Sequence, residues 1–309
     1  MSDTTPLRLG TRASPLALAQ AELTVTALTA AHPGIAVTLV PMTATGDRIQ
    51  DRALAEVGGK ALWTRELDAA LGEGRIDFAV HSLKDVETLR PAAFRLAALL
   101  PRADVRDRLV VRPDWAATSI AELPGGARVG TSSPRRAAQL KSRRPDLVTP
   151  LLRGNVQTRL ARVADGTVDA TLLAAAGLDR LGMGDVGQSL SIAEILPAAS
   201  QGAIGIECRA DDAATGALLA AIDHGPTRAA VMAERALLAA LGGDCRSPVA
   251  AHARPYQGQL HLSAAIYASD GSWFTVGSIV VTSASAPSEL AAQLLEDAPD
   301  AVRALFSGG

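Results

Sequence analysis

The sequence predicts an α/β protein with two doubly wound lobes followed by a small C-terminal α+β domain that contains a three-stranded sheet. Its 309 residues exceed the size at which one hydrophobic core usually stops growing. Hydrophobic residues make up 48% of the chain but aromatic residues only 3%, so the core must consist mainly of Ala, Leu, Val and Ile. Strand and helix patterns alternate twice before the C-terminal part, which favours packed α/β layers over an all-β fold.

The first alternation begins near the N-terminus. Ser14 is typical of a helix N-cap and Pro15 of a first helical position, so we expect Thr11 and Arg12 in the turn before that helix. Apolar runs mark the strands, and apolar residues at helical spacing mark the helices. The expected elements are a strand at Leu7–Gly10, a helix at Leu16–Thr29, a strand at Ile35–Met42, a helix at Trp63–Leu71 and a strand at Ile76–Val80.

The same order restarts at Ala127. Ser133 and Pro134 again provide a cap and a first-turn proline. Two doubly wound lobes bind ligands at the carboxyl ends of their strands, so a cleft between the lobes is expected. The elements are a strand at Ala127–Gly130, a helix from Pro134, an apolar segment at Val148–Leu152, a helix at Asn155–Ala164, a strand at Val168–Leu173, a helix at Ala174–Leu181 and a strand at Gly202–Glu207.

The last part of the chain changes character. Hairpin turns such as Ser269-Asp270-Gly271 join its strands, which indicates a small antiparallel sheet. The expected elements are helices at Ala213–Ile222 and Thr227–Leu241, strands at Val249–Ala253, Gln259–Tyr267 and Ser272–Val281, and a helix at Ser288–Leu295.

One predicted strand ends in an abrupt run of polar residues. The apolar segment up to Val80 is followed directly by His81, and Lys84 and Asp85 come three and four residues later. In open α/β sheets such strand ends line the ligand site. A solvated loop is the simpler explanation for an arbitrary strand end, but this cluster of titratable groups favours a functional site.

Arginines gather at the predicted strand-to-helix turns. The helix N-termini at Ser14 and Ser133 add free N–H groups that favour anions. Guanidinium groups bind carboxylates in a bidentate manner, so this set suits a ligand with many carboxylates. The alternative for any single residue is a surface arginine, since only three lysines occur among 30 basic residues. The set comprises Arg12, Arg135, Arg136, Arg153, Arg159 and Arg180.

The two cysteines differ in context. Cys208 follows an apolar strand and is expected to be a buried, inert thiol. Cys245 lies in a Gly-rich turn, where the adjacent Arg246 favours the thiolate, so a reactive and an inert role are both open. The five histidines are dispersed, and no metal site is predicted.

Charge and hydropathy exclude several classes of protein. A net charge of −2 disfavours binding to nucleic acid, which needs a basic face. No apolar run approaches the roughly 20 residues that a membrane span requires, and no signal-peptide pattern begins the chain. We therefore expect a cytoplasmic protein without membrane or nucleic-acid partners.

Taken in order, several segments resemble those of the porphobilinogen deaminase family, also called the hydroxymethylbilane synthases. The similarity runs from about Leu7 into the final domain. The segments are Thr11–Leu18, Gly46-Asp47, Gly58-Gly59-Lys60, Val80–Asp85, Gly130–Ser133, Leu152–Asn155, Gln201–Ala203 and Gly243-Asp244-Cys245.

The resemblance implies an enzyme that joins four porphobilinogen molecules head to tail, with release of ammonia, into the linear tetrapyrrole hydroxymethylbilane. It implies that Cys245 forms a thioether to a dipyrromethane cofactor that primes the chain. Asp85 would contact pyrrole N–H groups and stabilise the cation that develops as ammonia leaves. A fixed carboxylate in a dry cleft suits that task.

The resemblance also assigns further site residues. Asp85 and Lys84 are the expected catalytic residues, and both also bind the cofactor. The other expected cofactor ligands are Cys245, Thr131, Ser133, Arg135, Arg136, Arg153 and Gly154. The expected substrate ligands are Arg12, Ser14, Gln20, Arg153, Arg159, Arg180 and Gln201. The expected mobile loop contains Gly58, Gly59 and Lys60.

In fold, the resemblance implies two lobes similar to periplasmic binding proteins. We expect domain 1 at 1–100 and 198–218, domain 2 at 104–197 and domain 3 at 222–309. The expected protein is a monomer that passes its product to a cyclising synthase. Four positions depart from the common family pattern: Ala61, Trp63, Glu87 and Ser200.

Two other functions are compatible with parts of this sequence pattern. A solute-binding module could use the same two-lobe fold without catalysis. An enzyme with a phosphate-bearing ligand could use the helix N-terminus at Ser133, but no Walker or dinucleotide motif is present.

Overall fold

The computed structural model describes residues 6–44, 63–244 and 246–306. These residues form two compact units, each described separately here. The described part of unit 1 comprises 6–44, 63–103 and 202–228, and that of unit 2 comprises 104–201, 229–244 and 246–306. The expected division into three domains is not tested by this two-way separation and stays a proposal.

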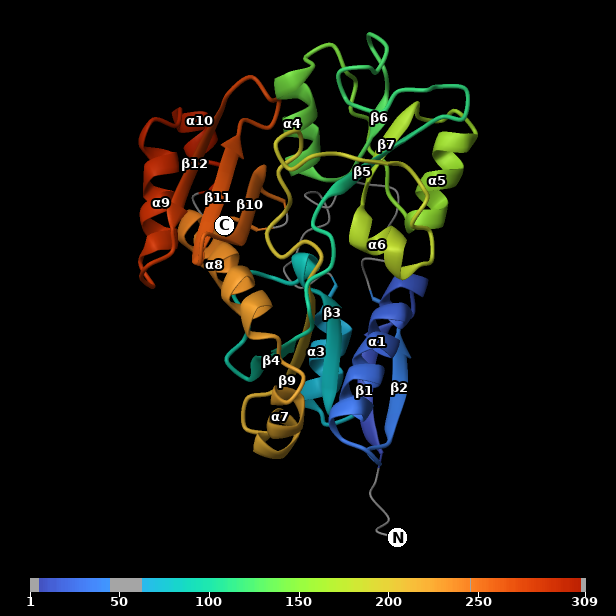
Figure 1. The fold of residues 1–309 in the computed structure, drawn as a ribbon, viewed down its shortest axis with the longest axis vertical. Coiled ribbons are helices and arrows are strands. Elements are labelled where there is room, and N and C mark those ends of the chain that lie inside the picture. Colours follow the sequence, from blue (N-terminus) through green and yellow to red (C-terminus); the bar gives the residue numbers. More distant parts are fainter. Residues whose placement is uncertain (1–5, 45–62, 245, 307–309) are drawn as a thin grey trace. The chain divides into compact units, whose positions relative to one another are not determined.

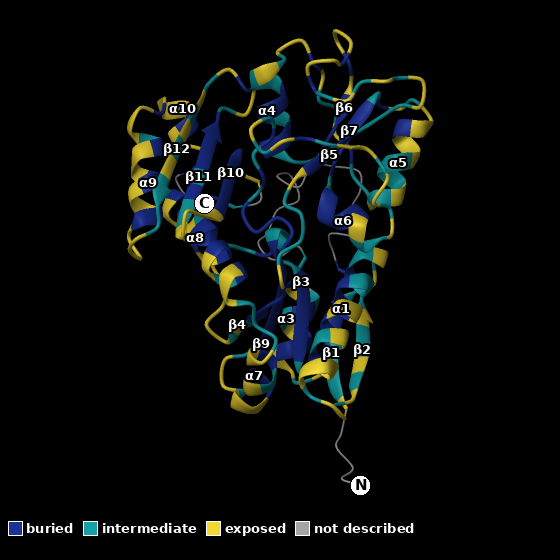
Figure 2. Cartoon of the chain, in the orientation of Figure 1, coloured by how far each residue is buried: buried dark blue, intermediate teal, exposed yellow. Residues whose placement is uncertain are grey.

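Unit 1 contains a five-stranded mixed sheet in the order β2-β1-β3-β9-β4 (Figure 1). β1 pairs in parallel with both β2 and β3, whereas β9 runs antiparallel to β3 and β4. Most of β3 is buried (Figure 2). The strands are β1 (Leu7–Arg12), β2 (Val37–Met42), β3 (Phe78–Ser82), β4 (Phe94–Leu99) and β9 (Ile204–Arg209).

Helices cover both faces of this sheet, as expected for a doubly wound lobe. On one face, Leu9 and Phe78 pack with Leu28 of α1 (Pro15–Ala31) and Leu219 of α7 (Ala213–Ala220). On the other face, apolar residues of α3 (Arg65–Gly72) pack against Ala79. The period-2 alternation of each strand therefore supplies both cores.

Unit 2 begins with a four-stranded sheet in the order β6-β7-β5-β8. α4 (Pro134–Arg143) packs on one face through Leu140, and α5 (Val156–Ala164) packs on the other through Val163. Ser133 and Asn155 cap these helices through their side chains. The remaining elements are β5 (Asp107–Val111), β6 (Val129–Gly130), β7 (Ala170–Ala174), α6 (Ala175–Arg180) and β8 (Gln188–Ser189).

The C-terminal part of unit 2 is an antiparallel sheet in the order β10-β11-β12. Leu237 of α8, Leu290 of α9 and Val302 of α10 belong to one core with the strands. On the opposite side, Ala138 of α4 packs against Ala265 and Tyr267. The elements are α8 (Gly225–Leu241, which starts in unit 1), β10 (Val249–Tyr256), β11 (Gln259–Tyr267), β12 (Phe274–Val280), α9 (Ala286–Glu296) and α10 (Asp300–Arg303).

The predicted fold class is confirmed, with local corrections. Thr11 and Arg12 are the last residues of β1 rather than a turn, because their backbones continue the pairing with β2. Cys208 lies within β9 rather than after it. The segment 148–152 contributes only an isolated bridge from Val148 to Arg128. β4, β5, β8 and α10 were not predicted; β5 escaped notice because its first two residues are charged.

None of the helices in the described part of the chain has the length and apolar character needed to cross a membrane.

Candidate active site

The tip of β3 carries the polar run that the sequence singled out. After Ser82 the chain makes a 3-10 turn, Leu83–Asp85, whose start is fixed by a 3.1 Å hydrogen bond from Leu83 N–H to the Ala203 carbonyl. The Leu83 side chain is 1% exposed and packs against Gly205, where an added Cβ would lie 2.8 Å from Leu83 Cδ1. Gly205 therefore allows the turn to be anchored directly on β9.

The anchored turn leaves Lys84 and Asp85 at an intermediate degree of exposure, in contrast to the buried Leu83. Among the described residues, none donates a hydrogen bond to the Asp85 carboxylate or pairs with it as a cation. Asp85 is thus partly exposed on the turn that follows β3, and its role in the site stays a prediction.

A buried contact between a histidine and a carboxylate joins β3 to β9. His81 Nε2 is 3.3 Å from Glu207 Oε2, and both side chains are under 5% exposed. Burial favours a higher pKa for Glu207, but the contacts with His81 and Arg90 outweigh it and lower the pKa to about 2. Glu207 is therefore a carboxylate throughout the neutral range.

Three predicted substrate ligands lie at the start of unit 1. The Arg12 guanidinium lies over the Trp63 ring, 4.3 Å from its centroid. Ser14 Oγ accepts the Ala17 N–H at 3.4 Å as the N-cap of α1. Gln20 is only 2% exposed. Its side-chain amide exchanges hydrogen bonds of 2.8 and 2.9 Å with the Ser82 hydroxyl, which ties α1 to the tip of β3.

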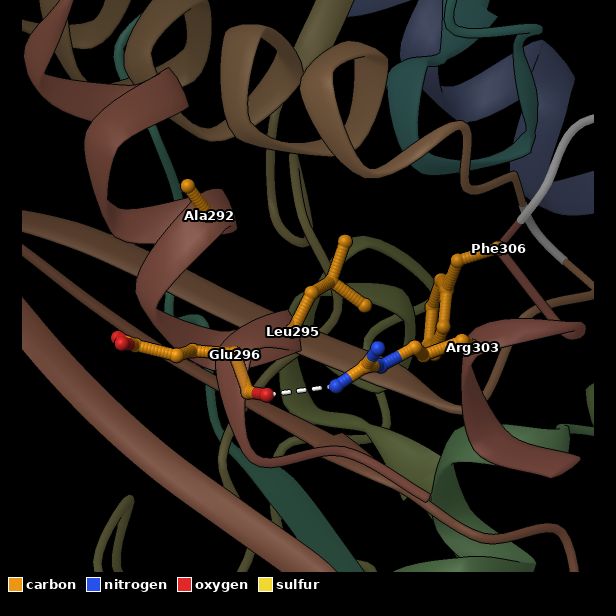
Figure 3. A pocket seen from close by; sticks show the side chains of 5 residues that line it. All are labelled: Ala292, Leu295, Glu296, Arg303 and Phe306. Atoms are coloured by element: carbon orange, nitrogen blue, oxygen red, sulfur yellow. Dashed lines mark hydrogen bonds between the residues drawn. The ribbon is translucent and has the colours of Figure 1, made fainter. Parts of the chain in front are cut away.

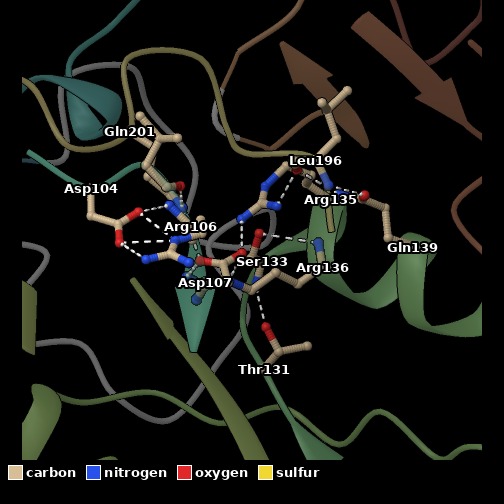
Figure 4. Close-up of polar contacts among 11 residues, drawn as sticks. Asp104, Arg106, Asp107, Thr131, Ser133, Arg135, Arg136, Gln139, Leu196 and Gln201 are labelled. Atoms are coloured by element: carbon tan, nitrogen blue, oxygen red, sulfur yellow. Dashed lines mark hydrogen bonds and ion pairs between the residues drawn. The ribbon is translucent and has the colours of Figure 1, made fainter. Parts of the chain in front are cut away.

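Four predicted cofactor ligands lie together in unit 2, at the start of α4 (Figure 4). Thr131 Oγ1 accepts the Ser133 N–H at 3.1 Å, and Ser133 Oγ accepts the Arg136 N–H at 3.4 Å. Arg135 and Arg136 are about 5% exposed and both pair with the buried carboxylate of Asp107, at 2.8 and 2.7 Å.

Asp107 is the centre of this cluster. The Gln201 amide also donates to it, at 2.9 Å, and to the Val105 carbonyl at 2.7 Å. Burial favours a higher pKa for Asp107, but the charges of Arg136 and Arg135 hold it well below its usual range. Burial lowers the pKa of Arg135. Two guanidinium groups thus share one carboxylate, which leaves one excess positive charge in the cluster.

The remaining predicted anion ligands lie on α5 and α6 or next to them. Gly154 has a φ of +106°, and an added Cβ would lie 2.7 Å from Thr158 Cγ2, so glycine is required there. Arg159 Nε donates to the Gly154 carbonyl at 3.0 Å. Burial lowers the pKa of Arg180 to about 10. Arg153 precedes this turn at intermediate exposure.

These donors fit a cofactor rich in carboxylates. The buried Arg135 Nε has no hydrogen-bond partner among the described residues, and the Asp107 cluster carries one more cation than anion. Excess buried positive charge is unfavourable until an anion compensates it. No group of three or more His, Cys, Asp and Glu residues suited to a metal occurs in the described part of the chain.

Cys245 and the loop residues Gly58, Gly59 and Lys60 lie outside the described residues. On either side of Cys245, the Asp244 carboxylate and Arg246 Nη2 form an ion pair of 2.5 Å. Cys208 is fully buried and its Sγ lies 3.4 Å from Arg95 Nε, which confirms the predicted buried thiol.

A pocket elsewhere in unit 2 contains none of the predicted site residues. Figure 3 shows it between α9 and α10, with the Arg303 guanidinium donating to the Glu296 carbonyl at 2.6 Å. Its lining residues are Ala292, Leu295, Glu296, Arg303 and Phe306.

Sequence reasoning missed Asp107, Arg90 and Glu207. A charged residue inside or next to an apolar strand was the available signal, since Glu207 interrupts the run from Ala203 and Asp107 precedes Leu109–Val111. Asp107 pairs with Arg135 and Arg136, 28 and 29 residues away, and Arg90 pairs with Glu207, 117 residues away, so these pairs could not be read from local patterns.

Comparison with known proteins gives a consistent family match. Residues 7–217 match the family model described as "Porphobilinogen deaminase, dipyromethane cofactor binding domain", and residues 228–298 match "Porphobilinogen deaminase, C-terminal domain".

Curated relatives carry the same name. "Porphobilinogen deaminase" of Sphingopyxis alaskensis is 67% identical over 98% of this chain and 97% of its own length. The protein of that name from Xanthomonas euvesicatoria is 52% identical over 82% and 83%, and "Porphobilinogen deaminase, chloroplastic" of Oryza sativa is 48% identical over 86% and 75%. A similar solved structure, the L-cystine solute receptor of Neisseria gonorrhoeae, is 16% identical with a TM-score of 0.40, covering 70% of this chain and 85% of its own.

Proposed function

Because the chain belongs to the porphobilinogen deaminase family, we propose that it condenses four porphobilinogen molecules into hydroxymethylbilane and releases ammonia at each step. This makes it a transferase of tetrapyrrole biosynthesis with hydroxymethylbilane synthase activity. The match extends over nearly the whole chain and therefore includes both the α/β part and the C-terminal part.

The Asp85 carboxylate is the observation that carries the mechanism. It lies at the end of a buried strand on a turn anchored by Leu83, and no described residue neutralises it. A carboxylate held in this way stabilises a cation that forms when the substrate loses ammonia, and it needs no reorganisation at that moment. Its oxygens also suit acceptance of pyrrole N–H groups.

The basic residues of unit 2 would bind the acetate and propionate groups of the cofactor and the growing chain. The proposed ligands are Thr131, Ser133, Arg135, Arg136, Arg153, Gly154, Arg159 and Arg180. Arginine is suited to this role because its planar fork binds carboxylates through two parallel hydrogen bonds. The Asp107 cluster adds the excess positive charge that such an anion would compensate.

The dipyrromethane, held by a thioether to Cys245, would supply the pyrrole carbon to which the first substrate is joined. Lys84 of the chain lies beside Asp85 and would bind carboxylates there, while Arg12, Ser14, Gln20 and Gln201 would serve the incoming substrate. We further propose a cytoplasmic monomer whose product passes to a cyclising synthase, with Gly58, Gly59 and Lys60 in a loop over the site.

Replacement of Asp85 tests the mechanism. Asp85→Asn keeps the size of the side chain but removes its charge, so turnover should fall by at least 100-fold. Asp85→Glu keeps the charge in a displaced position and should retain measurable turnover. An Asp85→Asn enzyme with a near-normal rate would contradict the electrostatic role.

The mass of the intact protein tests the covalent cofactor. The wild type should carry the added mass of a dipyrromethane, and Cys245→Ala should lose both that mass and activity. Cys208→Ala is the matched control, because that thiol is fully buried in β9, and it should keep both. An active wild type without added mass would refute the thioether.

The solute-binding alternative is not favoured. Both family models that match are named for the deaminase, and the relatives that match over most of their length carry that name.

A further inference from the structure

The segment that follows Asp85 is held by one guanidinium group among three carboxylates. Arg90 Nη2 lies 2.5 Å from Asp68 Oδ1 and 2.9 Å from Glu207 Oε2, and Nη1 lies 2.8 Å from Glu87 Oε2. The Arg90 side chain is only 11% exposed. Contacts as short and as shielded as these are stronger than ion pairs on an open surface.

The three carboxylates come from three separate parts of unit 1. Asp68 is on α3, Glu207 is on β9, and Glu87 is in the same segment as Arg90. Glu87 is also fixed on its own, since both of its oxygens accept the Thr64 hydroxyl at 3.1 Å. The chain from 87 to 90 is thereby attached to a helix on one side and to the sheet on the other.

This attachment begins two residues after Asp85. On the other side of Asp85, the 3-10 turn is anchored by Leu83 in its contact with Gly205. Val86 joins the two anchored parts in an extended conformation, with its N–H bonded to the Leu83 carbonyl at 3.2 Å. The Asp85 backbone is therefore held from both directions.

We propose that Arg90, together with Glu87, is a positioning residue that fixes the Asp85 carboxylate where the cation develops. The inference rests on the proposed function, since it assigns a role through Asp85. The physical reason is preorganisation: a charged group stabilises a transition state fully only when its position is already set, and a displacement of about 1 Å can reduce the rate about 100-fold.

The geometry requires arginine rather than a cation in general. Arg90 makes bidentate contacts with Glu207, through Nε to Oε1 at 3.0 Å and Nη2 to Oε2 at 2.9 Å. It makes a second such pair with Asp68, at 3.1 and 2.5 Å. A lysine ammonium has no fork and cannot hold two carboxylates in this way, so Arg90→Lys should rescue only part of the loss.

Steady-state kinetics of the cofactor-loaded enzyme should separate positioning from simple stabilisation. Arg90→Gln should lower kcat by roughly 30- to 100-fold with KM changed by less than about 3-fold, because none of the three carboxylates that Arg90 holds belongs to a proposed substrate ligand. Glu87→Gln, a milder change, should lower kcat by roughly 3- to 10-fold. Arg75→Gln is the matched control: it breaks the exposed ion pair with Glu73 in the same unit and should leave kcat unchanged.

A double-mutant cycle with Asp85→Glu provides the second readout. In that background the carboxylate is already displaced, so Arg90→Gln should cause less than about 5-fold further loss. An equal loss in both backgrounds, or an effect on KM alone, would overturn the proposal. If Arg90→Gln fails to fold, the same cycle is run with Glu87→Gln. A loss of kcat from Glu87→Gln that is as large in the Asp85→Glu background as in the wild type would also overturn the proposal.

The outcomes also separate this inference from the proposed function. A slow Asp85→Asn enzyme combined with normal kcat in Arg90→Gln and Glu87→Gln would remove the positioning role alone. A near-normal Asp85→Asn enzyme would remove the role of Asp85 and the positioning role with it. Retention of the covalent mass on Arg90→Gln should accompany the kinetic loss, and its absence would show that the variant disturbs cofactor attachment instead.

Discussion

The backbone N–H of Ser200 donates a 2.6 Å hydrogen bond to Oε2 of the fully buried Glu234. The other oxygen, Oε1, accepts the Ala253 N–H at 2.7 Å. One carboxylate of α8 thus joins the segment before β9 to a strand of the C-terminal sheet. Ser200 makes this contact with a φ of +63°, a conformation that favours glycine.

Ser200→Gly should stabilise the protein. The substitution removes the strain that a Cβ causes in the left-handed conformation. It also removes a buried hydroxyl that has no partner among the described residues. We expect the free energy of unfolding to rise by about 1 kcal/mol, measured by denaturant titration. Ser200→Ala is the control, since it removes the hydroxyl but keeps the Cβ. A Gly variant less stable than the Ala variant would contradict the assigned strain.

Asp107→Asn should destabilise the protein strongly. It would leave Arg135 and Arg136 buried side by side without their carboxylate, which costs about 3–5 kcal/mol. The measurement is the midpoint of denaturant unfolding. Asp104→Asn is the matched control, because its pair with the half-exposed Arg106 lies at the surface and should contribute under about 1 kcal/mol. Similar losses in both variants would disprove the importance of burial.

Gly271→Ala should weaken the packing of the β11–β12 hairpin on α4. Gly271 has a φ of +76°, and an added Cβ would lie 2.7 Å from both Lys141 Cβ and Ser142 N. We expect a loss of about 2–3 kcal/mol in the free energy of unfolding, from backbone strain and overpacking together.

Gly258→Ala is the control for this prediction. Its φ is +77°, but nothing lies within 4 Å of the added Cβ, so only the backbone strain of about 1 kcal/mol applies. Equal losses at the two glycines would show that the contact with α4 adds nothing.

Stability should fall in acid because of Glu207. Its folded pKa, about 2, is below the ordinary 4.5, so the stabilisation is fully present above pH 4.5 and is lost as the pH falls through 2. The shift corresponds to at most about 3 kcal/mol. Urea unfolding measured at several pH values gives the free energy of unfolding at each pH. Between pH 4.5 and 2 this free energy should fall less for Glu207→Gln than for the wild type. An equal fall in both proteins would refute this source of acid sensitivity.

The sequence determined the fold class and most element positions, and it indicated the residues that we propose for the site. Ser14 and Ser133 act as the expected caps, because capping depends on a residue and the few N–H groups that follow it. The strand tip at Asp85 was predicted for a similar reason, since a change from apolar to polar residues is visible within one short segment.

Only the tertiary structure decided which charges meet. Arg135 and Arg136 were read as ligands from their place at a helix start, yet both are paired with Asp107, 28 and 29 residues away. Arg90 and Glu207, separated by 117 residues, form the contact that we assign to the placement of Asp85. Local patterns fix hydrogen bonds between near neighbours in the chain, whereas buried ion pairs depend on sheet order and helix packing, which bring distant residues together.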